Sequence, residues 1–398
     1  LVQDRSLDAI FERVLRGSSG MKKHAFQTIA ALTGLCISMS ACSSDETDTA
    51  STETTTAEEA NTVTQTSGNK RDDVVPVAEN SSSAVENLPP NFDFQAHRGG
   101  RGEWTEESQK AFEAALDMGV TTLELDIVMS ADGVPVVWHD PEIQEDKCKD
   151  TEPAAEGDEQ FPYVGKLVHE LNWDQLQTLD CSLKLEEDFP EQQPVPGNKL
   201  LQLADVFELS KNDPDVYFNI ETKIEAEERE KSAEPQEFVD AILDAADEAG
   251  TTDRLMIQSF DWRSLPLVRE KNPNVPLVAL YDETTWVEGS KWIGDIDYNE
   301  FDGDVIAAVK ELGAEVISPG FAVPYESKAG EGDYNPTATR EYINKAHEAG
   351  IRVVPWTVND AETMEEQLDA GVDGIITDYP TRLKEILDER EIEYGRMK

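Results

Sequence analysis

The chain has 398 residues, and its 34 Lys and Arg against 83 Asp and Glu give a formal net charge of -49 at pH 7. So acidic a chain excludes binding to nucleic acid or to an anionic membrane surface through a basic patch, because that affinity comes from neutralising phosphates. The 13 Phe, 7 Trp and 9 Tyr provide enough apolar surface for a core, so disorder of the whole chain is excluded as well.

The N-terminal part of the chain is interpreted as a leader. Residues 1–20 precede Met21 and are expected to be non-native sequence translated from upstream of the true start. Residues 21–42 are typical of a signal peptide, with two lysines after Met21, an apolar stretch, and small residues before Cys42. This order resembles the lipobox of bacterial lipoproteins, which implies that Cys42 is the lipidated first residue of the mature chain. An ordinary secretory signal with an incidental Cys is the alternative.

The lipobox resemblance also predicts where the protein resides. A lipidated Cys42 anchors the chain on the periplasmic side of a bacterial membrane, and Ser43 in place of Asp favours the outer membrane. The lipid is then the only expected contact with a membrane, and without it the protein is expected to be periplasmic or secreted. Residues 43–90 are rich in Ser, Thr and acidic residues and contain no aromatic residue, which predicts a disordered tether. An interaction tail is the alternative for this segment.

After the tether, short apolar runs alternate with amphipathic helical patterns. The predicted strands are 92–96, 121–128, 134–138, 216–220, 255–257, 275–280, 314–317, 351–356 and 372–377. Several helical patterns end at a glycine, as Phe112, Ala115 and Leu116 do before Gly119. Repeated strand and helix units predict an α/β fold with a parallel sheet, of the TIM (β/α)8 barrel type, over residues 91–398. One strand candidate is then surplus or forms a hairpin arm.

The best candidate for that arm turns at Asp132-Gly133, a strong signal for a two-residue turn between two apolar runs. A two-residue turn would pair Asp126 with His139 across the hairpin. A carboxylate and an imidazole would then share one site.

Residues 141–200 interrupt the strand and helix rhythm with an acidic stretch and a Pro-rich stretch. This composition predicts an insertion in a loop that follows a strand, without a core of its own. The insertion contains Cys148 and Cys181, which remain as a pair in an oxidising compartment because Cys36 lies in the signal peptide and Cys42 is assigned to the lipid. A disulfide is the expected state, and metal binding by the pair is the less favoured alternative.

Charged and polar side chains gather at the ends of the first four predicted strands, where barrel enzymes place catalysis. They are His97, Arg98, Glu124, Asp126, His139, Asp140, Glu221 and Lys223. Packing alone explains them poorly, because unpaired buried charge is costly and strand interiors avoid it.

Seven motifs occur in order along the folded part of the chain. They are AHRGG at 96–100, LELDI at 123–127, DGVPVVWHD at 132–140, NIETK at 219–223, QSF at 258–260, PWTVND at 355–360 and DGIITDYP at 373–380. Together they resemble the glycerophosphodiester phosphodiesterase family, and the match extends from about Phe92 to the C-terminus. The chain departs from the family at residues 105–108, where Thr-Glu-Glu-Ser replaces Pro-Glu-Asn-Thr, so Glu107 stands in place of an Asn near a helix start.

The resemblance implies that His97 and His139 are the acid and base pair, and that Glu124, Asp126 and Glu221 hold a metal. Imidazole suits proton transfer because its pKa lies near the working pH. Carboxylate oxygens suit Mg²⁺ or Ca²⁺ better than Zn²⁺, which prefers His and Cys. The resemblance favours Ca²⁺ over Mg²⁺ as the single divalent cation.

The resemblance also implies that Arg98 and Lys223 face the phosphate and that Trp356 lines the substrate pocket. A structural ion network that includes the two cations is the alternative for the charged residues, and a place in the core is the alternative for Trp356. Other polar residues receive no functional role, either as structural residues or as surface histidines: Asp140, Gln258, Asp378, His169 and His347.

The activity that the resemblance implies is hydrolysis of a small-molecule glycerophosphodiester to sn-glycerol 3-phosphate and an alcohol such as choline or ethanolamine. The neighbouring glycerol hydroxyl is the implied nucleophile and gives a cyclic phosphate that water then opens. One alternative is a lysophospholipase D-like phosphodiesterase, against which the acidic stretch at 141–160 argues. The other is a catalytically silent, phosphodiester-binding lipoprotein, which would be expected to lack a His or a metal carboxylate, whereas the motifs retain both kinds of residue.

Overall fold

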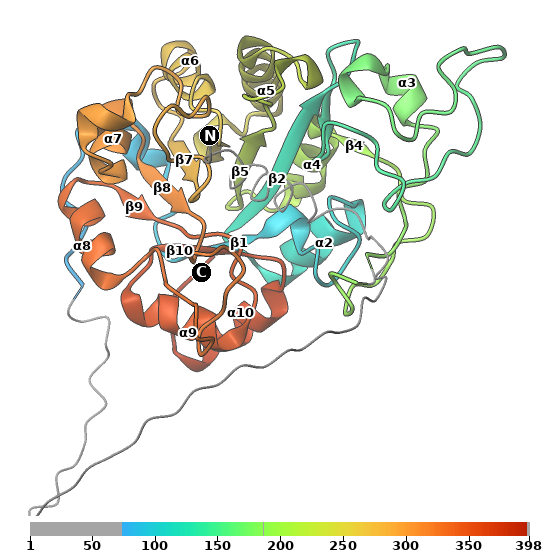
Figure 1. The fold of residues 1–398 in the computed structure, drawn as a ribbon. Helices are drawn as coiled ribbons and strands as arrows, with labels where there is room; N and C mark the ends of the chain where they lie inside the picture. The colour runs from blue at the N-terminus through green and yellow to red at the C-terminus, as the bar shows by residue number, and fades with distance from the viewer. Residues whose placement is uncertain (1–73, 186, 396–398) are drawn as a thin grey trace, which may run out of the picture. The chain divides into compact units, whose positions relative to one another are not determined.

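The computed structural model describes residues 74–185 and 187–395, and its central feature is a ring of parallel strands (Figure 1). The staves of this ring are β1 (Asp93–Ala96), β2 (Thr122–Met129), β5 (Tyr217–Thr222), β6 (Leu255–Ser259), β7 (Leu277–Tyr281), β8 (Val316–Pro319), β9 (Arg352–Val353) and β10 (Gly374–Thr377). Neighbouring staves pair in the order β10-β1-β2-β5-β6-β7-β8-β9. The ring closes between β9 and β10, where Asp373 N donates to Val353 O at 2.9 Å. The predicted TIM barrel is therefore confirmed.

Helices cover the outside of the barrel (Figure 1). They are α2 (Gln109–Met118), α4 (Leu203–Leu209), α5 (Pro235–Ala249), α6 (Ser264–Lys271), α7 (Val305–Leu312), α8 (Arg340–Glu348), α9 (Ala361–Ala370) and α10 (Pro380–Glu389). Short 3-10 helices lie in the connections: η2 (Ser83–Asn87), η3 (His97–Gly99), η4 (Val168–Glu170), η5 (Ser210–Asn212), η6 (Arg229–Lys231), η7 (Thr252–Arg254) and η8 (Tyr298–Phe301). In α2, Ser108 Oγ accepts a hydrogen bond from Ala111 N and Gly119 ends the helix at a φ of 80°, as its sequence predicts.

The alternation of side chains along the staves decides which residues reach the barrel interior. In β2, Leu123 and Leu125 belong to the main apolar cluster, which also contains buried residues of the helices. Glu124 and Asp126 alternate with these leucines and therefore point into the barrel. All of β2 is buried, as expected of a parallel strand covered on both faces. A smaller cluster of inward-facing residues packs around Leu88, namely Met256, Val278, Val316, Val354 and Ile376.

The predicted hairpin exists, but its register differs by one residue from the prediction. β3 (Pro135–Val137) runs antiparallel to β2 and also pairs with β4 (Leu201–Gln202). Ile127 pairs with Val137, so that Trp138 N donates to Asp126 O at 3.1 Å and His139 lies one residue beyond. The turn is longer than two residues because Ser130 N donates to Val134 O, which leaves residues 131–133 as its tip.

The insertion at residues 141–200 lies to one side of the barrel and contains the short helix α3 (Trp173–Leu176) (Figure 1). The sequence predicts that the insertion has no core of its own, and the structure shows that it shares a core with the hairpin. Apolar side chains of the insertion pack with the outer faces of β2 and β3 in a cluster of their own: Val128, Val136, Trp138, Ile143, Cys148, Tyr163, Val168, Leu171, Leu176, Leu179, Cys181 and Leu200. Cys148 and Cys181 are joined by a disulfide inside this cluster. The hairpin arm thus supplies the surface on which the insertion folds.

The N-terminal strap, residues 74–90, also differs from the prediction, because the sequence predicts a disordered tether as far as residue 90. Instead, the strap packs against the barrel: Val75 N donates to Asn344 Oδ1 at 2.9 Å, and Ala84 and Leu88 are buried. Isolated small or aliphatic residues in a polar segment give no periodic signal of their own. They become ordered here because the barrel offers a surface to cover.

His347 on α8 lies beneath the strap, so its predicted surface position is wrong. Its Nδ1 is 2.6 Å from Val75 O and its Nε2 is 2.8 Å from Asp373 Oδ2. Burial acts to lower the pKa of His347, but the hydrogen bond to Asp373 raises it overall. The polar sequence of α8 gives no indication that His347 is buried, because the strap and not the barrel covers this face of the helix.

The predicted leader and most of the predicted tether lie outside the described residues, and so does Cys42. Within the part of the chain that the structure describes, no helix is long and apolar enough to cross a membrane.

Candidate active site

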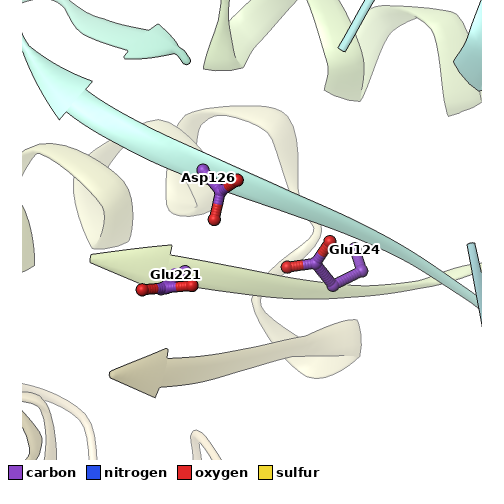
Figure 2. Close-up of side chains that lie close together, drawn as sticks. All are labelled: Glu124, Asp126 and Glu221. Carbon is purple, nitrogen blue, oxygen red and sulfur yellow. The ribbon is translucent and has the colours of Figure 1, made fainter. Parts of the chain in front are cut away.

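Three carboxylates converge at one end of the barrel interior (Figure 2). Glu124 and Asp126 lie on β2, and Glu221 lies on the neighbouring β5, directly opposite Asp126 in the strand register. One oxygen from each side chain lies within 4.8 Å of the other two. All three residues are at most 7 % exposed, so this convergence takes place away from bulk water.

The electrostatics of these carboxylates reflect their crowding. Burial, with repulsion from Asp126, raises the pKa of Glu124 well above its usual range. Burial also raises the pKa of Glu221 to about 7, although Lys223 Nζ lies 2.8 Å from Glu221 Oε1. Burial acts to raise the pKa of Asp126 too, but the Arg98 guanidinium, whose Nε lies 2.9 Å from Asp126 Oδ2, lowers it overall. Without further positive charge, two of the three groups are therefore driven toward their protonated forms.

This set of residues fits a hard divalent cation. The buried Asp126 Oδ1 accepts no hydrogen bond from any described residue, so one ligand position is open on the central carboxylate. Oxygen donors alone are the ligands that Ca²⁺ and Mg²⁺ prefer. Glu124, Asp126 and Glu221 are thus brought together as the sequence predicts, and they could hold a metal.

Gln258 on β6 fixes the orientation of Glu124, although the sequence analysis assigns it no functional role. Gln258 Nε2 donates to Glu124 Oε1 at 2.6 Å, and Gln258 Oε1 accepts from Asn219 Nδ2 at 2.8 Å. The same Asn219 amide donates to Gln95 Oε1, and Gln95 Nε2 donates to Asp93 Oδ2. This chain of buried amides crosses the barrel interior and ends at Glu124, one of the triad of carboxylates formed by Glu124, Asp126 and Glu221. Its signal in the sequence is the recurrence of polar residues at inward positions of β1, β5 and β6.

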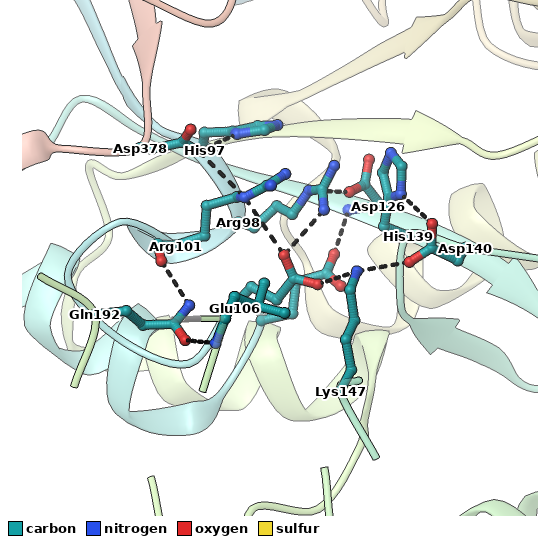
Figure 3. Close-up of polar contacts among 12 residues, drawn as sticks. His97, Arg98, Arg101, Glu106, Asp126, His139, Asp140, Lys147, Gln192 and Asp378 are labelled. Carbon is teal, nitrogen blue, oxygen red and sulfur yellow. Dashed lines mark hydrogen bonds and ion pairs between the residues drawn. The ribbon is translucent and has the colours of Figure 1, made fainter. Parts of the chain in front are cut away.

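His97 lies at the end of β1 with its ring held by Asp378 (Figure 3). His97 Nδ1 is 2.5 Å from Asp378 Oδ1, and Asp378 Oδ2 accepts from Asn359 Nδ2 at 2.7 Å. His97 Nε2 lies 3.9 Å from Glu124 Oε2, beside the triad. Burial lowers the pKa of His97, although Asp378 opposes this effect. A neutral ring that donates Nδ1–H to Asp378 leaves Nε2 free to accept a proton.

His139 follows β3 and has a carboxylate partner of its own in Asp140 (Figure 3). His139 Nδ1 is 3.0 Å from Asp140 Oδ1. Burial, together with the nearby charges of Arg98 and Lys223, lowers the pKa of His139 to about 3. The contact of Nδ1 with Asp140 leaves Nε2 of His139 as the nitrogen available for proton transfer.

Asp140 and Asp378 are therefore the main omissions of the sequence analysis, since each orients one of the two imidazoles. Both stand at the carboxyl end of a strand, which is the signal that could have identified them. Asp140 directly follows His139, but the pairing of Asp378 with His97 depends on the barrel bringing the ends of β1 and β10 together, and that contact is invisible in the linear order of the chain.

The two predicted phosphate-facing cations differ in their surroundings. Arg98 is 4 % exposed, and its guanidinium is engaged by Asp126 and by Glu106, whose Oε2 lies 3.0 Å from Arg98 Nη1. Lys223 contacts Glu221 and is more exposed, with 16 % of its side chain open to solvent. Lys223 is thus the better placed of the two to meet an anion that enters from solvent.

The departure from the family at Glu107 leaves the start of α2 intact, because Ser108 caps the helix. Glu107 is buried, and its Oε1 accepts a hydrogen bond from Asp126 N at 2.9 Å. Burial, with repulsion from Asp126, raises the pKa of Glu107 well above its usual range. A neutral Glu107 can accept this hydrogen bond, as an amide oxygen would.

Trp356 lies after β9, partly exposed, in a group of aromatic rings. Its ring centroid is 5.2 Å from that of Phe260 and 5.0 Å from that of Tyr325. Lys223 Nζ lies 5.9 Å from the centroid of Phe260, so this aromatic group borders the cationic side of the site. Trp356 therefore belongs to an aromatic group beside Lys223, and its contact with the substrate stays a prediction.

Comparisons with known proteins agree with this geometry. Residues 97–382 match the model of the glycerophosphoryl diester phosphodiesterase family. A glycerophosphodiester phosphodiesterase of Caldanaerobacter subterraneus subsp. tengcongensis is 27 % identical over 290 residues, which is 72 % of this chain and 94 % of that protein.

Solved structures are similar to this chain in fold. A putative glycerophosphoryl diester phosphodiesterase from Silicibacter pomeroyi DSS-3 has a TM-score of 0.64 and 27 % identity, and the match covers 79 % of this chain and all of that one. A phosphodiesterase of Oleispira antarctica, solved with the product sn-glycerol-3-phosphate, has a TM-score of 0.53 at 17 % identity, over 75 % of this chain and 97 % of that one. The chain belongs to the glycerophosphoryl diester phosphodiesterase family.

Proposed function

We propose that the protein hydrolyses glycerophosphodiesters to sn-glycerol 3-phosphate and an alcohol, with His97 and His139 as the acid and base pair. One observation carries the proposal: two imidazoles, each with its Nδ1 beside a carboxylate, flank a buried group of three carboxylates that fits a divalent cation. The glycerol 3-phosphate bound to the Oleispira antarctica phosphodiesterase supports the product class. A silent binding protein would have no need for both oriented imidazoles.

Glu124, Asp126 and Glu221 would hold the cation, and we favour Ca²⁺ over Mg²⁺. When bound, the cation supplies positive charge against the negative charge that builds up on the phosphoryl oxygens. Lys223 would bind the phosphate before the reaction and stabilise the same developing charge. Arg98 would act beside it, while its ion pairs with Asp126 and Glu106 keep the guanidinium in place. Trp356 would offer an apolar wall to the carbon atoms of the substrate.

The proton transfers follow from the orientation of the two rings. Nε2 of one imidazole takes the proton from the glycerol hydroxyl next to the phosphate, and the oxygen of that hydroxyl attacks phosphorus. The other imidazole, in its protonated form, gives a proton to the alcohol that leaves. A cyclic phosphate results, and water opens it with the roles of the two rings reversed. Asp378 and Asp140 hold the Nδ1–H of each ring throughout, so that Nε2 faces the reacting atoms.

We expect glycerophosphocholine and glycerophosphoethanolamine to be hydrolysed, and bis(p-nitrophenyl) phosphate to be hydrolysed much more slowly. The reason is that the synthetic diester lacks the neighbouring hydroxyl that the proposed route needs. The measurement is release of alcohol from each substrate by the purified protein with Ca²⁺ present. Equal or faster turnover of the synthetic diester would argue for a general phosphodiesterase with another nucleophile.

We also propose that the mature protein is a lipoprotein on the periplasmic side of a bacterial membrane, with the outer membrane favoured. The motif before Cys42 supports this proposal. Mass spectrometry of the mature protein from its native membrane is expected to find an acylated Cys42 at its start. A mature chain that starts at a later residue with a free amine would refute the anchor.

A further inference from the structure

Lys147 is a buried cation that the insertion, and not the barrel, contributes to the active site (Figure 3). Its side chain is 10 % exposed. Lys147 Nζ lies 2.5 Å from Glu106 Oε1 and 2.6 Å from Asp140 Oδ2, and it lies 5.2 Å from the centre of the Trp138 ring. Burial acts to lower the pKa of Lys147, but the two carboxylates raise it overall, so the ammonium group keeps its charge.

The two carboxylates that Lys147 joins belong to different loops and serve different functional residues. Asp140 uses Oδ1 for His139 and Oδ2 for Lys147, so both of its oxygens are engaged. Glu106 uses Oε2 for Arg98 and Oε1 for Lys147 in the same manner. The ammonium group therefore connects the loop that holds Arg98 to the loop that orients His139. Such a connection limits rotation of either carboxylate about its terminal bond.

The backbone around Lys147 is held by the insertion. Cys148 follows directly and is joined to Cys181, and Leu183 N donates to Lys147 O at 3.2 Å. Cys148 N donates to Gln144 O at 2.9 Å. The disulfide and these hydrogen bonds fix the point from which the lysine side chain reaches the site.

We propose that Lys147 is a positioning residue for catalysis, which keeps Asp140 on His139 and Glu106 on Arg98, and that the Cys148–Cys181 disulfide holds it in place. The proposal rests on the proposed function for its activity tests. Its geometric part, the orientation of His139, can be tested separately. The insertion would then contribute a functional residue, Lys147, to the active site.

Lys147→Met is the main test, because it keeps most of the side-chain volume and removes the charge. We expect kcat to fall about 10- to 100-fold with KM changed less than about threefold, since a small misplacement of a reacting group slows chemistry more than binding. Lys147→Arg keeps the charge and is expected to recover part of the lost kcat. The matched control is Lys149→Met, whose side chain is 55 % exposed and pairs with Asp180 in the same insertion. It is expected to keep wild-type kcat.

A purely structural role would lower thermal stability and leave kcat per folded molecule unchanged, which would overturn the proposal. The proposal would also be overturned if the wild type were active and the folded Lys147→Met variant were equally active. If the wild type itself is inactive on glycerophosphodiesters, the proposed function fails, and ¹⁵N spectra of the imidazoles still decide about Lys147. These spectra should show one fixed tautomer for His139 in the wild type and a mixture in Lys147→Met. Identical His139 signals in the two proteins would overturn the proposal.

The disulfide can be tested against the same variant. Reduction of the native protein is expected to lower the kcat of the wild type toward that of Lys147→Met, and to lower the kcat of Lys147→Met little further. This non-additivity is expected because both changes act through one side chain. Equal losses in the two proteins would show that the disulfide does not act through Lys147.

Discussion

Replacing His97 or His139 with Ala is expected to lower kcat by about 10²- to 10⁴-fold, because each change removes one proton-transfer partner from the reaction. Cation binding should remain, since neither imidazole belongs to the triad of carboxylates. The measurement is steady-state hydrolysis of glycerophosphocholine by the folded, cation-loaded variants. His169→Ala is the matched control, because this partly exposed imidazole contacts only the backbone carbonyl of Glu230 among the hydrogen bonds of the described residues.

The double variant His97→Ala with His139→Ala should lose far less than the product of the two single losses. Both residues act in the same step, so the second change removes little that the first has left. If both single variants kept kcat near the wild-type value while folded and cation-loaded, the acid and base assignment would be wrong and the cyclic-phosphate route would lose its support.

Removal of the divalent cation is expected to abolish turnover and to lower the melting temperature by several degrees. A ligand present at about 100 times its Kd stabilises a fold by about 2.7 kcal/mol, and this stabilisation is lost on chelation. Asp126→Asn should reproduce the loss and should no longer respond to added Ca²⁺. Asp117→Asn, which alters an exposed carboxylate on α2, is the control.

The same site predicts how cation binding depends on pH. Glu221, with a pKa raised to about 7, and Glu124, with a pKa raised well above its usual range, hold protons in the cation-free protein, and the cation must displace them. Apparent affinity for Ca²⁺ is therefore expected to fall as pH decreases below about 7. Because both pKa values are raised, the cation-free fold should also lose stability as pH rises from about 4.5 toward 7, with the sign that linkage requires. Titration calorimetry and thermal melts at several pH values measure both effects. Full activity in excess chelator, or affinity that is independent of pH, would refute this assignment of the carboxylates.

The sequence was sufficient to predict the barrel and the convergence of Glu124, Asp126 and Glu221. The alternation of strands and helices can be recognised in the sequence because each strand and each helix has its own periodicity of apolar residues. The inward positions of Glu124 and Asp126 follow from simple alternation along β2. Of the two possibilities for the ninth strand candidate, the structure shows the hairpin arm.

What the sequence could not provide depends on contacts between distant segments. The pairing of Asp378 with His97 requires closure of the barrel between β10 and β1. The position of Lys147 requires the insertion to fold onto the outer face of the hairpin. The sequence predicts that residues 74–90 are disordered because the surface on which they pack is formed by strands and helices much later in the chain. The predicted hairpin register differs from the observed one by one residue, because the dipeptide signal at Asp132-Gly133 indicates where a turn lies but not how long it is.

The most direct test of the central claim is a ³¹P NMR time course of glycerophosphocholine with the purified protein, first in excess chelator and then after Ca²⁺ is restored to the same sample. The proposed site predicts no change in the diester while the chelator is in excess. After the cation is restored, it predicts loss of the diester and growth of sn-glycerol 3-phosphate, with the alcohol released in equal amount. Conversion of the diester in excess chelator, or no conversion after the cation is restored to the folded protein, would contradict a metal-dependent glycerophosphodiester hydrolase.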